Sequence, residues 1–255
     1  FIKWLLQDKF FSAKFIYENG SYKEHEVIFY WYMTFSEKAI KYYSNIKVPG
    51  NLPENIKILN PYSNTDVLKC VKNFYEKFFD DNNKRIFIWG INPGRFGGGI
   101  TGISFTDPAA LKEYCGIDNN FGSKKELSSR FIYDMINSYG GVREFFNSCC
   151  LTALYPLAIV KGNTNYNYYD EPALYRLLRG EIVSSIKAQI DFGADRSFAV
   201  CLGKKNYKYF KEVNDENNFF EKIEILEHPR YIMQYKLKNK DNYINKYISC
   251  IKNKS

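Results

Sequence analysis

Two spacings of hydrophobic residues alternate along the chain. Between residues 65 and 80 apolar side chains recur every three or four positions, as at Val71 and Phe74, which predicts a helix. Residues 86–91 instead form one short apolar run, which is typical of a buried strand. The helical spacing also predicts helices at 36–46, 107–115, 125–139, 171–192, 204–212 and 240–252. Further strands are predicted at 145–155, 197–202 and 222–227, and loops at 51–62 and 162–170.

The alternation of strands with helices indicates a parallel sheet that is covered on both faces. We therefore expect an α/β fold, a three-layer α/β/α domain around a central four-stranded parallel sheet. Each predicted strand ends in a candidate site segment, and parallel strands bring such ends to one edge, where open sheets bind ligands. These segments are 90–105, 152–157, 202–205 and 227–232.

The domain organisation follows from the lack of an internal break. No linker or low-complexity stretch divides the chain, and 45% hydrophobic residues can fill a sizeable core, so we expect one domain at 33–255. Residues 1–32 contain no Met, whereas Met33-Thr34-Phe35 is typical of a natural protein start. We interpret residues 1–32 as an upstream extension and assign them no function.

Two of the predicted strand ends carry candidate chemistry. The strand at 86–91 leads into Asn92-Pro93 and a glycine-rich loop, and Pro93 favours an extended backbone at Asn92. The strand at 222–227 leads into His228. Glycines allow backbone N–H groups to approach a ligand closely. Read alone, the amide also fits a structural turn, the imidazole fits packing, and the loop equally fits nucleotide phosphates.

The charge of the chain is positive and uneven. The net charge is +8, and residues 228–255 contain seven Lys or Arg side chains against one acid, Asp241. This segment is either a solvated basic helix or a surface that neutralises phosphates, and its position after His228 favours the second. Further candidate phosphate contacts are Lys204 and Lys205, and also Ser123, Lys124 and Lys125, with solvated loops as the equal alternative.

The cysteine pattern disfavours a metal centre. None of the six cysteines forms a C-x-x-C pair, so we expect no zinc site, no iron–sulfur cluster and no other cofactor. A disulfide scaffold is also disfavoured, which fits a reducing compartment. Without an 18-residue apolar run or a clear signal peptide, we expect no membrane association. The expected protein is a cytoplasmic monomer.

The segment after the first strand resembles the first motif of the uracil-DNA glycosylase superfamily. The motif Gly-x-Asn-Pro-Gly-x-Phe-Gly matches residues 90–97, and the following Thr-Gly-x-x-Phe matches residues 101–105. The family's second motif begins His-Pro, here His228-Pro229. The closest resemblance is to the single-strand-selective monofunctional (SMUG) type, in a bacterial SMUG-like branch. It implies a monofunctional DNA glycosylase that binds DNA containing deaminated bases and starts base excision repair.

The resemblance also implies roles for individual residues. Asn92 corresponds to the residue that positions the attacking water, and His228 to the one that stabilises charge on the base. Phe105 corresponds to the ring that stacks on the flipped base. The loop that admits the base contributes Gly94, Phe96, Gly97 and Gly98, although Phe96 also fits a packing role under the loop. The segment that the family uses as a wedge into DNA is Arg230, Tyr231 and Ile232.

One position departs from the better-known SMUG enzymes. They place an Asn three residues before a Pro on the second strand, where it reads the uracil edge, and the chain has Ala153 there. Thr152 could substitute only in another strand register, because neighbouring side chains face opposite sides. We therefore expect uracil to be read by backbone groups, and the pocket to tolerate xanthine and hypoxanthine.

Two other functions fit parts of the sequence. A non-catalytic nucleic-acid-binding relative would keep the basic surface but would not need both Asn92 and His228. A nucleotide or sugar-phosphate enzyme would use residues 94–99 as a phosphate loop. The chain lacks Gly-Lys-Ser/Thr and a complete Gly-x-Gly-x-x-Gly with a matching acid, which ranks this function lower.

Overall fold

The computed structural model describes residues 13–18, 21–26 and 33–254. The chain forms two units, 1–33 and 34–255. In the first unit, strands β1 (Ala13–Glu18) and β2 (Ser21–Glu26) pair in antiparallel fashion. Most of residues 1–32 lie outside the described residues, so their interpretation as an upstream extension stays a prediction.

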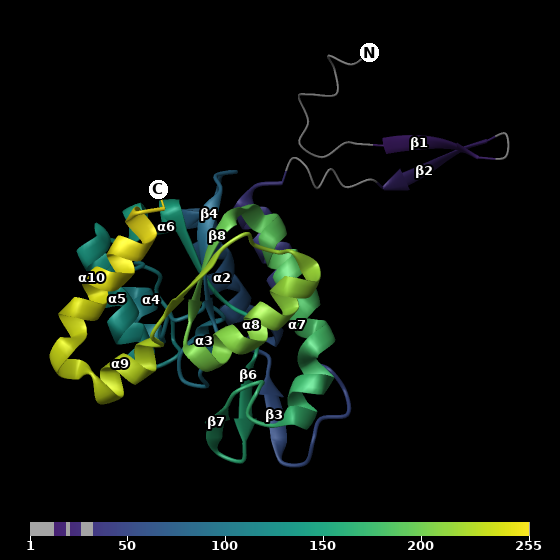
Figure 1. Ribbon diagram of the computed structural model, residues 1–255. Coiled ribbons are helices and arrows are strands. Elements are labelled where there is room, and N and C mark those ends of the chain that lie inside the picture. Colours follow the sequence, from purple (N-terminus) through teal and green to yellow (C-terminus); the bar gives the residue numbers. More distant parts are fainter. Residues whose placement is uncertain (1–12, 19–20, 27–32, 255) are drawn as a thin grey trace. The chain divides into compact units, whose positions relative to one another are not determined.

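The second unit is built on the predicted four-stranded parallel sheet (Figure 1). Its strand order is β5 (Cys149–Ala153), β4 (Arg85–Gly90), β8 (Ala194–Leu202) and β9 (Ile223–Leu226). Every residue of β4 is buried, as expected for a central strand covered on both faces. The register aligns Gly90 with Ala153, so the ends of these two strands lie side by side.

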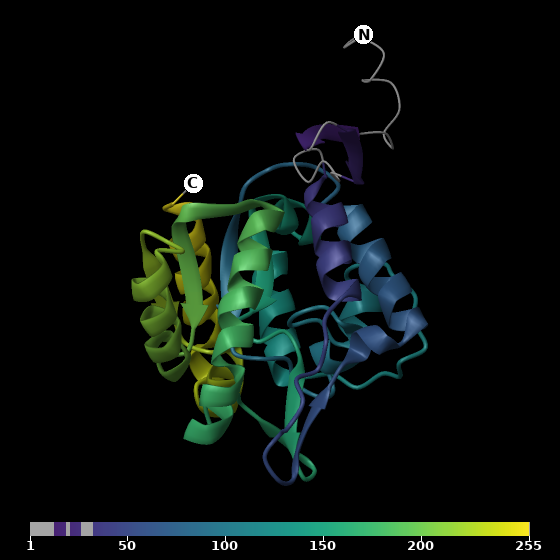
Figure 2. The same ribbon diagram turned by 90° about the vertical axis from the view of Figure 1, so that its right-hand side faces the viewer.

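Helices cover both faces of this sheet, which gives the predicted three layers. Figures 1 and 2 show α5 and α10 against one face and α7 and α8 against the other. The longer helices are α1 (Phe35–Ser44), α2 (Thr65–Phe78), α5 (Leu127–Tyr139), α7 (Pro172–Gly193), α8 (Lys204–Asn217) and α10 (Lys240–Lys252). The shorter ones are α3 (Gly98–Thr101), α4 (Pro108–Glu113), α6 (Val142–Ser148), α9 (Pro229–Tyr235) and the 3₁₀ helices η2 (Pro61–Ser63) and η3 (Leu237–Asn239).

The strand order places a crevice at the carboxyl end of β4. From β4 the chain crosses to β5 on one side, and β8, the strand that follows in the main sheet, lies on the other side. The chain connections on the two sides of β4 run in opposite directions and leave a gap between them. Open α/β sheets bind their ligands in such a crevice. Asn92 lies just beyond the end of β4 and therefore enters it.

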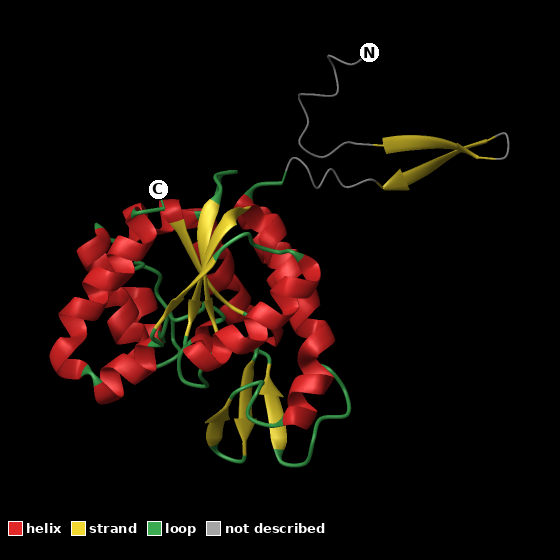
Figure 3. Cartoon of the chain, in the orientation of Figure 1, coloured by secondary structure: helices red, strands yellow, loops and turns green. Residues whose placement is uncertain are grey.

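A second, three-stranded antiparallel sheet lies beyond this edge (Figure 3). It consists of β3 (Ile56–Leu59), β6 (Ala158–Lys161) and β7 (Thr164–Tyr166). The predicted loops at 51–62 and 162–170 were therefore wrong in part. These strands have only three or four residues, and β7 is too polar to give an apolar alternation. Gly162, with φ of +56°, makes the turn between β6 and β7.

The predicted strand at 145–155 was too long. Gly140 and Gly141 end α5 as expected, but the chain then starts a new helix, α6, which continues to Ser148. Phe145 and Phe146 are buried from this helix, so their apolar character reflects helix packing and not strand pairing. The residues directly after His228 were not predicted to be helical, but Pro229 at the first helical position starts α9.

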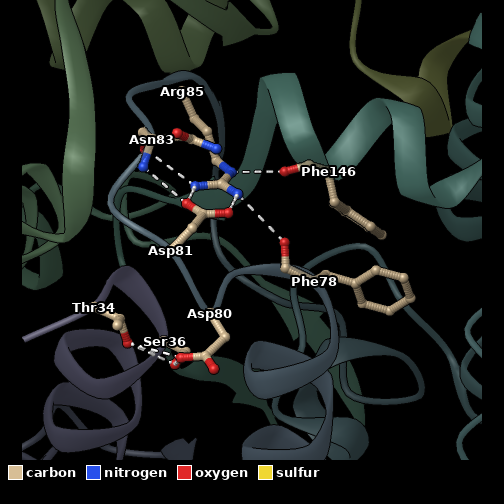
Figure 4. A network of polar contacts seen from close by, with 8 residues as sticks. All are labelled: Thr34, Ser36, Phe78, Asp80, Asp81, Asn83, Arg85 and Phe146. Atoms are coloured by element: carbon tan, nitrogen blue, oxygen red, sulfur yellow. Dashed lines mark hydrogen bonds and ion pairs between the residues drawn. The ribbon is translucent and has the colours of Figure 1, made fainter.

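A buried arginine fixes the start of β4, at the opposite edge from the crevice (Figure 4). The Arg85 side chain is fully buried, and its guanidinium donates bidentately to the Asp81 carboxylate at 2.8 Å. It also donates to three backbone carbonyl oxygens, including that of Phe146 at 2.7 Å. These bonds satisfy a charge that would otherwise be costly to bury. They tie β4 to α2 and α6.

Candidate active site

A cavity of about 850 Å³ opens at the carboxyl edge of the main sheet. Its walls come from the segments that follow β4 and β9, from the end of β5, from the start of α5 and from the β6–β7 hairpin. The sequence-predicted residues among its lining are Asn92, Gly94, Phe96, Gly98, Phe105, Ala153, His228, Arg230 and Tyr231. Segments more than a hundred residues apart in sequence therefore meet at one site.

The Asn92 amide is held at both ends by backbone atoms at the end of β7 and just beyond it. Its Nδ2 donates to the carbonyl oxygen of Tyr166 at 3.0 Å, and its Oδ1 accepts the N–H of Tyr168 at 3.1 Å. Because a carbonyl only accepts and an N–H only donates, these bonds fix which way the amide faces. One Oδ1 lone pair and one Nδ2 hydrogen remain for a further partner. Asn92 thus also anchors a wall of the cavity.

The His228 ring caps α9 and is a neutral donor. Its Nδ1 accepts the backbone N–H of Arg230 at 3.2 Å, so the neutral ring carries its proton on Nε2. Burial, together with the nearby Arg230 charge, lowers the pKa of His228 to about 4. At neutral pH the ring therefore offers an uncharged Nε2–H donor.

The Phe105 ring is positioned by a strained turn and by a glycine. Phe105 has a left-handed backbone with φ of +57°, which is unfavourable for a residue with a bulky side chain. The buried Thr101 closes this turn, because its hydroxyl donates to the carbonyl oxygen of Thr106 at 2.7 Å. The ring packs on Gly90, where an added Cβ would lie 2.5 Å from Phe105 Cζ. Its centre lies 6.0 Å from that of the His228 ring.

The glycines of the loop are close to other protein atoms on the side where a Cβ would stand, and their role in admitting the base stays a prediction. A Cβ on Gly94 or Gly97 would lie within 2.5 Å of the Glu126 carboxylate. A Cβ on Gly98 would lie 2.9 Å from the carbonyl oxygen of Ile103. Gly97 is buried and is not among the residues that line the cavity. The loop is therefore glycine-rich because it folds tightly on itself and on Glu126.

Glu126 is a cavity residue that the sequence did not reveal. Its Oε1 accepts the N–H of Phe96 at 3.3 Å, and its own N–H donates to the buried Asp107 at 2.8 Å. Burial raises the pKa of Glu126. The contact depends on a turn between α4 and α5 that no local spacing encodes, and a lone acid at the start of a predicted helix is a weak signal.

The end of β5 presents no polar side chain to the cavity. Ala153 lines the cavity, as the departure from the family motif implied. The Thr152 hydroxyl donates to Gln189 Oε1 within a buried network, so its side chain is not turned to the cavity. Gln189 Nε2 in turn donates to the carbonyl oxygen of Ala153 at 3.2 Å. The register that would let Thr152 replace the missing Asn is not the one that forms.

The assignment of Ile232 to a DNA wedge was wrong, because the segment is helical. Successive helical side chains rotate around the axis, so Arg230 and Tyr231 face the cavity mouth while Ile232 is fully buried. Tyr235, one turn after Tyr231, is 70% exposed and also lines the cavity. The centres of the Tyr231 and Tyr235 rings are 5.5 Å apart.

The other predicted DNA contacts lie outside the cavity lining. Lys204 and Lys205 start α8, and Lys205 pairs with Asp170 at 3.4 Å. In the basic C-terminal segment, Lys240 and Lys246 form ion pairs with acids of the domain. That segment is thus in part a helix whose lysines pair with acids of the domain, and its role in neutralising phosphates stays a prediction. A DNA contact by Lys204 or Lys205 stays a prediction.

The described ranges offer neither a metal-binding cluster nor a membrane span. In residues 13–18, 21–26 and 33–254, no three His, Cys, Asp or Glu side chains gather in an arrangement that could hold a metal ion. In the same residues, no helix is both long and apolar enough to cross a bilayer.

Comparisons with known proteins agree with this geometry. The sequence model of the uracil DNA glycosylase superfamily matches residues 76–252. Among solved structures, wild-type SMUG2 from Pedobacter heparinus is 42% identical to this chain, with a TM-score of 0.84. The similarity covers 88% of this chain and 100% of that one. No curated protein matches the chain.

The matched region contains both motif segments and the whole main sheet. The chain therefore belongs to the uracil DNA glycosylase superfamily as a SMUG-type member, and it is a DNA glycosylase, an enzyme that hydrolyses N-glycosidic bonds in DNA.

Proposed function

We propose that the protein flips uracil out of DNA and hydrolyses its N-glycosidic bond with Asn92 and His228, leaving an abasic site for base excision repair. The observation that carries the proposal is the meeting of a fixed amide, a neutral imidazole and the Phe105 ring around one cavity. Extrusion of the base from the stack is needed before such a cavity can receive it.

Bond cleavage leaves the sugar cation-like and the base anionic, so the site must hold a water near C1′ and stabilise charge on the base. The free Oδ1 lone pair of Asn92 is suited to accept a hydrogen bond from that water. An amide is a weak base, so it orients the water and does not deprotonate it. The bonds to Tyr166 and Tyr168 keep the amide oriented before substrate arrives.

On the base, His228 is suited to donate Nε2–H to the carbonyl oxygen on which charge develops. A neutral donor achieves this without placing a second full charge in the site. The Phe105 ring then supplies a stacking surface, worth roughly 1–3 kcal/mol per base in other nucleic-acid sites. No lysine is among the described residues that line the cavity, which fits hydrolysis without Schiff-base formation and strand cleavage.

We extend the proposal to xanthine and hypoxanthine. The end of β5 offers only the methyl group of Ala153, and a pocket without a polar reader has lost its main means of rejecting analogues. A nucleotide-phosphate site in the glycine loop is less well supported, because the Glu126 carboxylate occupies the open side of Gly94 and Gly97. Monomeric state and a cytoplasmic location with DNA remain part of the proposal.

The test is base release from labelled oligonucleotides that contain uracil, xanthine or hypoxanthine, followed by alkali. Wild type is compared with Asn92→Ala and His228→Ala, with thermal unfolding as a control because both residues also hold backbone. Alkali-dependent cleavage that is lost in both folded variants supports the proposed roles. No release from any lesion, with salt-sensitive DNA binding intact, would identify a non-catalytic binding protein instead.

A separate variant tests the proposed activity on xanthine and hypoxanthine. Ala153→Asn restores an amide at the strand end and is expected to favour uracil over xanthine and hypoxanthine. If wild type releases uracil alone and Ala153→Asn changes nothing, the extension fails while the uracil activity stands.

A further inference from the structure

Two cations share one aromatic ring at the edge of the cavity. The Arg95 guanidinium carbon lies 4.4 Å from the centre of the Phe96 ring, and Lys124 Nζ lies 4.0 Å from the same centre. Arg95 follows β4, whereas Lys124 precedes α5, so two separate segments bring like charges together. Attraction to the ring explains part of this arrangement, but it does not remove the repulsion between the two charges.

The nearby carboxylates do not compensate these charges. Glu126 is close in sequence to Lys124, but its carboxylate accepts the backbone N–H of Phe96. Lys125 forms an ion pair with Glu113 at 2.9 Å. Within the described part of the chain, neither Arg95 nor Lys124 has an acidic side chain within ion-pair distance. The cations are therefore available to an anion from outside the protein.

The backbone that carries Arg95 is fixed. Its N–H donates to Asn165 Oδ1 of the β6–β7 hairpin at 3.1 Å, and the next N–H is held by Glu126. Both Arg95 and Phe96 line the cavity that contains Asn92 and His228. An anion bound by the pair would thus lie at the mouth of the site.

We propose that Arg95 and Lys124, seated on Phe96, bind one backbone phosphodiester of the DNA next to the flipped nucleotide. This inference rests on the proposed function, since it assigns a subsite for the same substrate. It gives Phe96 a role other than base binding, because its ring supports the two cations. A phosphate contact carries no base information; it fixes the register of the strand on the enzyme.

Salt dependence of binding tests the subsite. The probe is a fluorescent single-stranded oligonucleotide with a tetrahydrofuran abasic-site analogue, and the variants are Arg95→Gln, Lys124→Gln and the double variant. Because the pair neutralises one phosphate, its loss in the double variant should lower the slope of log K against log salt by about 0.7 for a single strand. Arg143→Gln is the matched control: Arg143 is exposed on α6, at the opposite edge of the sheet, and its slope should equal that of wild type.

A scan with methylphosphonate linkages, which are uncharged, identifies the phosphate. One linkage near the abasic analogue should weaken wild-type binding and have no effect on the double variant. Unchanged slopes in the folded variants would overturn the subsite. So would losses of affinity from the double variant and from the methylphosphonate that are additive at every linkage. Either result leaves the glycosylase proposal intact. If wild type releases no base and shows no salt-dependent DNA binding, the proposed function itself has failed.

Discussion

Replacing Gly90 by alanine should displace the Phe105 ring, to which we assign stacking on the base. The new Cβ would lie 2.5 Å from Phe105 Cζ and 2.7 Å from Cε2, and Thr152 O lies 3.3 Å away on another side. The ring must retreat by about 1 Å to reach a normal contact distance. The Phe105 backbone has little freedom to absorb this shift, because its left-handed turn is closed by Thr101.

We expect two effects, a loss of stability and a slower release of the base. Overpacking of this kind destabilises a fold by about 1–3 kcal/mol. A displacement of about 1 Å in a positioning group slows a reaction on the order of 100-fold. Urea unfolding measures the first effect, and single-turnover release of uracil measures the second. Gly180→Ala is the control, since nothing lies within 4 Å of that Cβ in α7, and it should gain about 0.5–1 kcal/mol.

A double variant separates crowding from other causes. In a Phe105→Leu background the ring atoms that clash are gone, so Gly90→Ala should cost much less stability there than in wild type. Base release should stay slow in the double variant, because the stacking surface is missing. If Gly90→Ala alone is as stable and as active as wild type, Phe105 is not held against Gly90 and the assigned stacking role is unsupported.

Three further predictions concern other parts of the site and its support. Arg85→Met should lower the free energy of unfolding by about 3 kcal/mol, because Asp81 loses its bidentate partner; a loss below about 1 kcal/mol in urea would contradict this. Since the pKa of His228 falls from 6.5 to about 4, the stability from its neutral ring is complete above pH 6.5 and is lost as pH falls towards 4. Single-turnover base release should accordingly stay level down to about pH 5, and a midpoint near 6.5 would exclude the neutral donor. Asn92→Asp should lower both the thermal midpoint and the rate, because a carboxylate oxygen would face the carbonyl oxygen of Tyr166; an unchanged melting curve would show that this bond contributes little.

The sequence predicted the sheet and most helices because their signals are local and repeated. The run at 86–91 and the spacing at 65–80 differ by about two residues from β4 and α2. That Asn92 and His228 lie at one cavity could be predicted for a related reason: each closely follows a strand whose carboxyl end must lie at one edge of a parallel sheet.

The remaining features depend on contacts between distant segments. Glu126 reaches the glycine loop only because Asp107 holds its backbone. Residues 162–170 were predicted as a loop, although they contain β7 and their asparagines line the cavity. Ile232 shows a different limit, since no secondary structure was predicted for its segment and the helix that starts at Pro229 buries its side chain.

The double attachment of Asn92 has a practical consequence for capturing the enzyme on damaged DNA. An inactive variant at this position would also release Tyr166 and Tyr168, so a trapped complex would have an altered wall around the lesion. His228→Ser is the better choice for such a trap. Serine caps helices well, so α9 should keep its start while the imidazole, to which we assign the hydrogen bond to the base, is lost. A complex trapped in this way would preserve the shape of the site that selects the lesion.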